Sequence, residues 1–266
     1  MKLVMGNLSS FEFLRSNPRD SIIFTDVDGT LSEIAAAPDK AYVGDKMKQT
    51  LNELADGYKV VVVSGRPAGV AKQMVGSDKI TYLGNHGLEK LAGNKLSRLN
   101  SARYVSAIKR LKPELEQAVA KFEGVRFEDK GQALAIHYRL ADNQPEIRRR
   151  ILEIAEPATR QHGFNIIEGR KVIEIKPGLS DKGRAVADMI TESRRKQVVY
   201  LGDDRTDVDA FRKLKELRAG NVIRGYALGV ASEETPAEIR AEADFCFTSI
   251  NEVESFLEWL AEKRKT

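Results

Sequence analysis

Short apolar runs alternate with segments of helical periodicity near both ends of the chain. Residues 21–25 and 59–63 are apolar almost throughout, which is typical of strands buried on both faces of a sheet. Between them, apolar residues recur at helical spacing over 45–55, and Asp56-Gly57 ends the pattern. The same alternation predicts strands at 80–83, 197–201, 226–230 and 245–247 and helices at 67–75, 181–191, 206–217 and 250–262. This order predicts an α/β fold, a parallel sheet with helices on both faces.

The middle of the chain has a different order of elements. The predicted elements there are helices at 101–122 and 144–162 and strands at 125–128, 133–138, 164–168 and 172–175. This αββαββ order predicts an inserted α+β domain at 88–177, between the two halves of a core at 1–87 and 178–266. Lys and Arg outnumber Asp and Glu in the insert, which suits an anionic ligand.

The composition of the 266 residues narrows the classes of protein that fit. Hydrophobic residues make up 42% and charged residues 31%, with a net charge of +4, and no apolar run is long enough to span a membrane. The basic runs 148–150 and 194–196 fall in or beside helix-like segments, so solvated faces explain them better than nucleic-acid binding. We expect a cytoplasmic monomer or weak dimer with neither nucleic acid nor membrane as a partner. The single cysteine, Cys246, lies in an apolar run and is interpreted as a core residue.

Polar residues follow three of the predicted core strands at the point where each strand ends. The first strand runs into Asp26 and Asp28, the second into Ser64, and the strand at 197–201 runs into Gly202 and Asp203. Because ligands bind outside the carboxyl ends of parallel strands, we expect these groups to meet at one edge of the sheet. A lysine at 182 begins a later predicted helix and is a fourth candidate for that edge.

These side chains together provide what phosphoryl transfer requires. Asp26, Asp28 and Asp203 suggest a site for Mg²⁺, because carboxylates tolerate one another around a divalent cation. Lys182 and Ser64 supply a positive charge and a hydroxyl group for phosphate oxygens. Asp26 can attack phosphorus, and Asp28 can protonate the leaving alkoxide and later deprotonate water. Aspartate and glycine also form turns after strands, but turn formation explains poorly why several buried strands end this way.

The order of these segments resembles the four motifs of the haloacid dehalogenase superfamily. The matching residues are 26–30, Ser64, Lys182 and 202–204. Within that superfamily the chain is most similar to the trehalose-6-phosphate phosphatase family. The segments that carry this similarity are 64–66, 84–89, 137–139, 174–177 and 202–207. The insert is similar to the cap domain of that family.

The resemblance implies a reaction and the residues that perform it. The reaction is hydrolysis of trehalose 6-phosphate to trehalose and phosphate, a step of trehalose biosynthesis. Asp26 would be the nucleophile and Asp28 the acid and base. Mg²⁺ would be bound by Asp26, Asp203 and the carbonyl group of Asp28, with Asp204 and Asp207 as second-sphere or alternate ligands.

Polar residues beside the motifs are candidate contacts to the substrate. Arg66 could reach the phosphate or the sugar, or it could pair with an acid at the sheet edge. His86, beside Asn85 and Glu89, could contact sugar hydroxyl groups or only hydrogen-bond a turn. The full set of candidate substrate-binding residues is Ser64, Gly65, Arg66, Asn85, His86, Glu89, His137, Arg139, Glu174, Lys176 and Asp207.

Four of these candidates lie on predicted strands of the insert. His137 and Arg139 alternate along one strand, and Glu174 and Lys176 alternate along another. A solvated sheet face is the simplest explanation of such polar positions. Because the resemblance places this face over the active site, we favour sugar recognition, more so for Glu174 and Lys176.

Other functions are compatible with parts of this pattern. Another phosphosugar phosphatase, a glycosyl-phosphoglycerate phosphatase or a phosphomutase could use the same aspartate pair. A sugar-phosphate sensor without activity would be expected to lack Asp26 or Asp28, and both are present. A kinase or NTPase is disfavoured, since the sequence contains neither a P-loop nor a Gly-x-Gly-x-x-Gly fingerprint after a strand.

Overall fold

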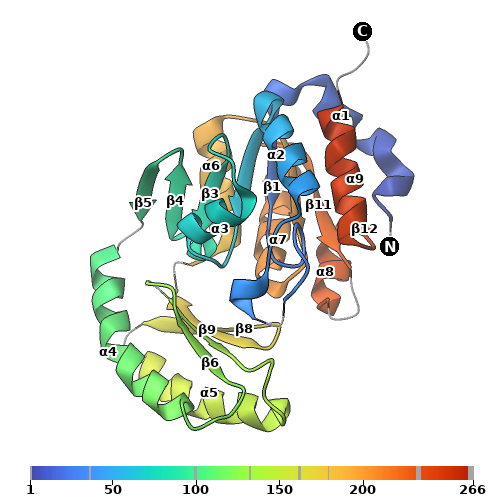
Figure 1. Cartoon of the computed structure of the whole chain (residues 1–266). Helices are drawn as coiled ribbons and strands as arrows, with labels where there is room; N and C mark the ends of the chain where they lie inside the picture. The colour runs from blue at the N-terminus through green and yellow to red at the C-terminus, as the bar shows by residue number, and fades with distance from the viewer. Residues whose placement is uncertain are drawn as a thin grey trace. The chain divides into compact units, whose positions relative to one another are not determined.

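The chain forms two compact units in the computed structural model (Figure 1). Unit 1 comprises Met1–Ser97 and Asp181–Thr266, and unit 2 comprises Arg98–Ser180. The sequence analysis set these boundaries at 87/88 and 177/178. The structure describes residues 2–35, 37–98, 101–131, 133–160, 163–178, 180–231 and 235–262.

Unit 1 contains the large sheet, whose strands have the order β12-β11-β10-β1-β2-β3-β4-β5. Strands β12 to β3 run parallel, and β4 is antiparallel to β3. The strands are β1 (Ser21–Thr25), β2 (Lys59–Val63), β3 (Thr81–Gly84), β4 (Glu89–Ala92), β5 (Lys95–Arg98), β10 (Gln197–Gly202), β11 (Arg224–Val230) and β12 (Phe245–Phe247). The central strand β1 lies between β10 and β2, so the residues that follow these three strands emerge side by side.

Helices cover both faces of this sheet, as the sequence predicts. On one face, α2 (Asp45–Gly57), α3 (Ala68–Val75) and α9 (Ile250–Ala261) enclose a core that includes Ile23. On the other face, α6 (Lys182–Ser193), α7 (Arg205–Ala219) and α8 (Ala237–Glu242) enclose Ile22 and Phe24. Neighbouring residues of β1 therefore enter opposite cores, which is why the whole strand is apolar. The predicted α/β fold is confirmed.

The N-terminal segment packs against the outer strand of the sheet. The Val4 amide donates to the Cys246 carbonyl at 3.0 Å, and the Cys246 amide donates to the Lys2 carbonyl at 2.8 Å. Cys246 is buried with a free thiol, so its prediction as a core residue is confirmed. Unit 1 also contains the short helices η1 (Met5–Phe11), α1 (Glu12–Ser16), η2 (Pro18–Asp20), η3 (Pro38–Lys40) and η4 (Asn85–Gly87).

Unit 2 is an antiparallel sheet with helices on one face. Its strands have the order β6-β7-β9-β8, with β6 (Arg126–Asp129), β7 (Leu134–His137), β8 (Phe164–Gly169) and β9 (Val172–Pro177). Helices α4 (Ser101–Val119) and α5 (Gln144–Arg160) share a core with Ile136, Ile173 and Ile175. The αββαββ order was therefore predicted correctly. The predicted end of the second helix, 161–162, lies outside the described residues.

The hairpin β4–β5, which adds residues 89–98 to the edge of the large sheet, was not predicted from the sequence. Glu89 is buried although it is charged, so β4 lacks the apolar pattern that identified the other strands. None of the helices in the described part of the chain combines the length and apolar character needed to cross a membrane.

Candidate active site

The first part of the candidate site is a tight turn directly after β1. The Asp26 amide donates to the Leu201 carbonyl of β10 at 2.9 Å, so the first aspartate stays tied to the sheet. Gly29 then adopts a φ of +86°, and a Cβ atom at this position would lie 2.1 Å from Oδ2 of Asp203. A glycine is required here both by the backbone conformation and by the close approach of that carboxylate. The turn after β1 thus fits against the residue that follows β10.

The second part is the segment after β10, which is ordered by Asp207. Oδ2 of Asp207 accepts the backbone amides of Asp203 at 3.1 Å and Asp204 at 3.0 Å. A Cβ atom on Gly202 would lie 2.4 Å from Cγ of Asp207, so only glycine allows this carboxylate to fold back so closely. Asp207 is fully buried and holds the backbone that presents Asp203.

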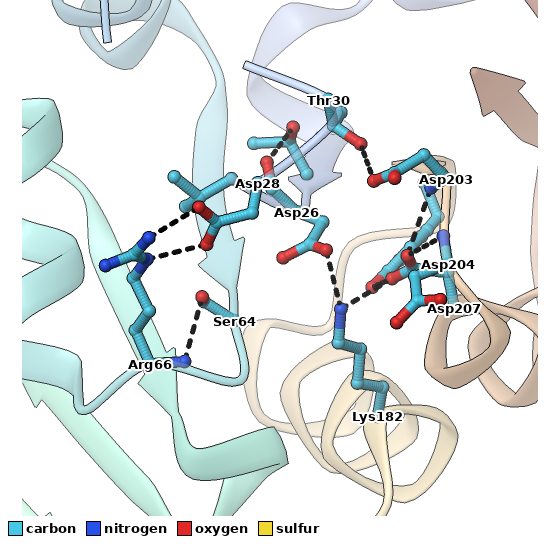
Figure 2. A network of polar contacts seen from close by, with 12 residues as sticks. Asp26, Asp28, Thr30, Ser64, Arg66, Lys182, Asp203, Asp204 and Asp207 are labelled. Carbon is cyan, nitrogen blue, oxygen red and sulfur yellow. Dashed lines mark hydrogen bonds and ion pairs between the residues drawn. The ribbon is translucent and has the colours of Figure 1, made fainter. Parts of the chain in front are cut away.

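A buried lysine joins the two segments (Figure 2). Nζ of Lys182 lies 3.0 Å from Oδ2 of Asp26 and 2.7 Å from Oδ1 of Asp207. Asp181 caps α6 by accepting the amides of Gly183 and Arg184, which places Lys182 in the first turn of that helix.

The charges of this group depend on burial and on one another. Burial alone would lower the pKa of Lys182, but the carboxylates of Asp207 and Asp26 raise it above its usual range, so the ammonium stays charged. Burial raises the pKa of Asp26 to about 7, although Lys182 acts in the opposite direction. The positive charge beside Asp26 therefore favours the ionised carboxylate that burial disfavours.

The donor atoms of this cluster suit a hard divalent cation. Carboxylate oxygens of Asp26, Asp203 and Asp207 all lie within 4.8 Å of one another, and all three residues are buried. Oδ1 of Asp203 also accepts the hydroxyl group of Thr30 at 2.8 Å. An all-oxygen set of this kind is what Mg²⁺ prefers. Among the described residues, the carboxylates of Asp28 and Asp204 are not part of this cluster.

Asp207 was expected to be an alternate ligand or a contact to the substrate, and its surroundings do not favour either role. Oδ1 accepts from Lys182 and from the Tyr200 hydroxyl group, and Oδ2 accepts two backbone amides. Four donors fill the four acceptor positions of a carboxylate. With Asp207 saturated in this way, Asp26 and Asp203 are the carboxylates that fit a cation.

Asp28 and Arg66 form a two-pronged ion pair beside the cluster. Nε of Arg66 lies 2.6 Å from Oδ2 of Asp28, and Nη2 of Arg66 lies 2.6 Å from Oδ1 of Asp28. The two side chains face each other, as Figure 2 shows. Of the alternatives for Arg66, the structure contains the pairing with an acid. Ser64 is buried in the same loop, next to Gly65, and its hydroxyl oxygen accepts the Arg66 amide at 3.1 Å.

The turn after β3 braces this loop through its backbone. Asn85 and His86 have φ angles of 49° and 54°, a left-handed conformation that is uncommon for residues other than glycine. Their amides donate to the carbonyl groups of Arg66 at 2.8 Å and Ser64 at 3.0 Å. Glu89 accepts the amide of Ala68 at the start of α3. All three side chains are buried, and their contacts with a sugar stay a prediction.

Comparison with known proteins identifies the family to which this arrangement belongs. The family model described as trehalose-phosphatase matches residues 24–243, which include all of unit 2, most of unit 1 and every segment of the candidate site. The chain belongs to the trehalose-phosphatase family. The predicted resemblance is therefore confirmed, and so is the prediction of a phosphoric monoester hydrolase family.

Named relatives in this family come from plants and bacteria. A protein of Oryza sativa named probable trehalose-phosphate phosphatase 4 is 30% identical over 97% of this chain and 71% of its own length. The trehalose-phosphate phosphatase of Mycobacterium tuberculosis is 36% identical over 73% of this chain, but the match covers only 51% of that protein. The chain thus corresponds to about half of the mycobacterial relative.

Solved structures share the fold of the trehalose-phosphatase family. A trehalose-6-phosphate phosphatase related protein superposes with a TM-score of 0.74 and 26% identity, covering 90% of this chain and 96% of its own. The C-terminal domain of the Candida albicans enzyme reaches 0.80 at 21% identity, covering 94% and 96%, which speaks for the fold alone.

Three of the candidate residues of unit 2, His137, Arg139 and Glu174, contact partners within that unit. Glu174 accepts from Lys130, and Nε2 of His137 lies 2.8 Å from Glu128. Glu174 and Lys176 are buried and point away from the face that carries Ile173 and Ile175. Arg139 was expected on the strand of His137, but β7 ends at His137, and Arg139 donates instead to the Arg170 carbonyl. Recognition of the sugar by these residues stays a prediction.

Two residues of the candidate site, Thr30 and Tyr200, were not singled out from the sequence. Thr30 fixes Asp203, and Tyr200 donates to Asp207 at 2.6 Å. Burial and the nearby Asp207 carboxylate hold the pKa of Tyr200 well above its usual range, so its hydroxyl group remains a donor. The available signal was a tyrosine in an otherwise aliphatic strand, two residues before Gly202.

Proposed function

We propose that this chain hydrolyses a sugar phosphate, with trehalose 6-phosphate as the substrate and an aspartyl-phosphate on Asp26 as the intermediate. The observation that carries the proposal is the buried Asp26 carboxylate, 3.0 Å from the Lys182 ammonium at the end of the central strand. The second carboxylate, Asp203, shares the same oxygen cluster. The names of the relatives support trehalose 6-phosphate as the substrate.

In the first step, a carboxylate oxygen of Asp26 forms a bond to phosphorus as the bond between phosphorus and the sugar oxygen breaks. Asp28 supplies the proton that the leaving alkoxide takes up. The Lys182 ammonium and the Ser64 hydroxyl group stabilise the negative charge on the phosphoryl oxygens. The products of this step are the free sugar and the aspartyl-phosphate.

In the second step, the oxygen of water forms a bond to phosphorus as the bond between phosphorus and Asp26 breaks, which releases inorganic phosphate and restores the Asp26 carboxylate. Asp28, now ionised, accepts the proton from that water and returns to its starting state. Arg66 lies 2.6 Å from both carboxylate oxygens of Asp28, and this ion pair must open at one oxygen before Asp28 can carry the proton that each step transfers.

The residues present fit Mg²⁺, which Asp26 and Asp203 would hold by carboxylate oxygens and Asp28 by its backbone carbonyl. When bound, this ion supplies positive charge against the phosphoryl oxygens. The close fit of Gly29 against the Asp203 carboxylate supports this assignment, because a side chain at residue 29 would displace that oxygen. Asp204, outside the carboxylate cluster, serves the site through its backbone amide.

A phosphate-release screen across sugar phosphates, with Mg²⁺ present, tests the proposal. We expect release from trehalose 6-phosphate to exceed release from other phosphosugars and from glycosyl phosphoglycerates. Turnover of a sugar phosphate to its isomer without release of phosphate would assign a phosphomutase instead. A preference for another phosphosugar would keep the chemistry and overturn the substrate.

Removal of the metal gives a second test. We expect a chelator in excess over Mg²⁺ to abolish phosphate release, because the carboxylate cluster would then repel the phosphoryl group. Activity should return when Mg²⁺ is restored, and addition of a matched amount of Mg²⁺-saturated chelator is the control. Undiminished release in excess chelator would contradict the metal assignment. A cytoplasmic location and a monomeric or weakly dimeric state stay predictions.

A further inference from the structure

Tyr200 is a buried residue of β10 whose hydroxyl group has no part in the steps above. Its ring stacks on Phe24 of β1 at a centroid distance of 6.2 Å and meets Phe211 of α7 edge-on at 5.8 Å. The residue has no exposed surface. A phenylalanine would pack equally well, so the packing alone gives no reason for a hydroxyl group. The hydroxyl group donates to Oδ1 of Asp207 at 2.6 Å, a short contact of the charge-assisted kind.

Asp207 connects this hydroxyl group to the reacting groups. The same Oδ1 atom accepts Nζ of Lys182 at 2.7 Å, and Oδ2 holds the backbone of Asp203 and Asp204. The Tyr200 hydroxyl group stabilises the negative charge of Asp207 without bringing another charge into the site. Its loss would leave this buried carboxylate with three donors in place of four.

Lys182 lies between two carboxylates, so its position depends on how each is stabilised. Nζ lies 2.7 Å from Asp207 and 3.0 Å from Asp26. If Asp207 loses a donor, its attraction for the ammonium increases relative to that of Asp26, because the buried charge has fewer other partners. Lys182 would then be held farther from Asp26 and from the phosphoryl group transferred to it.

We infer that Tyr200 is a positioning residue for the reaction at Asp26, acting through Asp207 to set the place of the Lys182 ammonium. The inference rests on the proposed function. Tyr200 itself touches neither substrate nor the reacting atoms. Its contribution is to hold the charge arrangement in which phosphoryl transfer becomes fast, rather than to bind the sugar phosphate.

The test compares Y200F with Y82F, a matched variant in the same sheet. Tyr82 of β3 is equally buried, and its hydroxyl group donates to the Ser77 carbonyl at 2.7 Å, away from the site. Both variants lose only a hydroxyl group and keep the ring. We expect Y200F to lower kcat about tenfold with KM within twofold of the wild-type value. We expect Y82F to change neither constant by more than twofold.

A third variant separates positioning from a general loss of stability. F211L loosens the packing around the Tyr200 ring, while Tyr200 keeps its hydroxyl group. It is expected to lower the melting temperature and to leave kcat within twofold of the wild type. Loss of one hydrogen bond to a buried carboxylate costs less than the total free energy of unfolding of a domain, so Y200F is expected to fold.

The outcomes distinguish the inference from the function on which it rests. Equal kcat values for Y200F and Y82F, or an equal loss of kcat in F211L and Y200F, would overturn the positioning role and leave the phosphatase proposal intact. A wild-type protein that releases no phosphate from any substrate of the screen would overturn the proposed function, and the inference with it.

Discussion

The two groups of charged residues in this chain, one in each unit, are built differently. In unit 1, the carboxylates of Asp26, Asp203 and Asp207 gather in a buried cluster, two of them around the ammonium of Lys182. In unit 2, acidic side chains lie against basic ones, as in Glu174 with Lys130 and Glu146 with Arg149 and Arg150. Buried carboxylates in excess of nearby cations are costly unless a ligand compensates them, whereas balanced pairs are compatible with a purely structural role. The buried cluster of like charges in unit 1 is therefore the group that a bound cation would stabilise.

The largest expected effect comes from the nucleophile. D26N keeps the volume of the side chain but removes its nucleophilic oxygen, so we expect phosphate release to fall by about 10⁴-fold or more. The melting temperature should remain close to that of the wild type. D45N, at an exposed position in the first turn of α2, is the control and should be fully active. Residual release by D26N of a tenth or more of the wild-type rate would rule out a covalent intermediate at this residue.

A smaller effect on kcat is expected when an added methyl group crowds the carboxylates of Asp26 and Asp203 but removes neither of them. In G29A the new Cβ atom would meet the Asp203 carboxylate at 2.1 Å, so we expect kcat to fall about 100-fold as that carboxylate moves. G76A is the matched control, because Gly76 has a φ of +79° and nothing within 4 Å of an added Cβ atom. Both variants share the backbone strain of about 1 kcal/mol. Only G29A should lose activity.

Equal kcat values for G29A and G76A would mean that the Asp203 carboxylate can move without consequence. The role of Asp203 at the site would then need revision. Melting temperatures of both variants, measured with and without Mg²⁺, give a check that is independent of turnover. Stabilisation by Mg²⁺ should be weaker in G29A than in G76A, since binding to the native state adds to its stability.

The smallest effect is expected in unit 2, where it should depend on the substrate. If Glu174 recognises the sugar, E174A should raise KM for trehalose 6-phosphate about tenfold and leave a small phosphate ester unaffected. E168A is the matched control, because Glu168 of the neighbouring strand β8 pairs with Arg148 of α5 and points to the opposite face. It should change neither substrate by more than twofold. An equal loss on both substrates in E174A would assign Glu174 to the fold.

The parallel strands of unit 1 and the first groups of the site could be predicted because they depend on local pattern. An apolar run such as 21–25 is buried on both sides, and parallel neighbours bring the residues that follow, Asp26 and Asp203, to the same edge. The αββαββ order of unit 2 could be predicted from the sequence for the same reason. These predictions needed only periodicity and the geometry of a parallel sheet.

The remaining parts of the site depend on contacts between distant residues. The partner of Arg66 was left open, since pairing with Asp28 requires two loops to approach within hydrogen-bond distance. The burial of Glu89 follows from its contact with the Ala68 amide, which no local pattern signals. Tyr200 lies in a strand that the sequence predicts, but only its distance to Asp207 in the structure indicates a role for its hydroxyl group.

The backbone pairing of residues 2–4 with Cys246 has a consequence for how the protein behaves at high concentration. β12 is the outer strand of the large sheet, and such a strand offers unsatisfied amide and carbonyl groups to other chains. Lys2 and Val4 occupy two of these groups, and the aromatic side chains of Phe11 and Phe245 close the layer beneath them. Trimming this segment would uncover the outer strand and favour association between sheets of separate molecules, even though every residue of the candidate active site would remain in place.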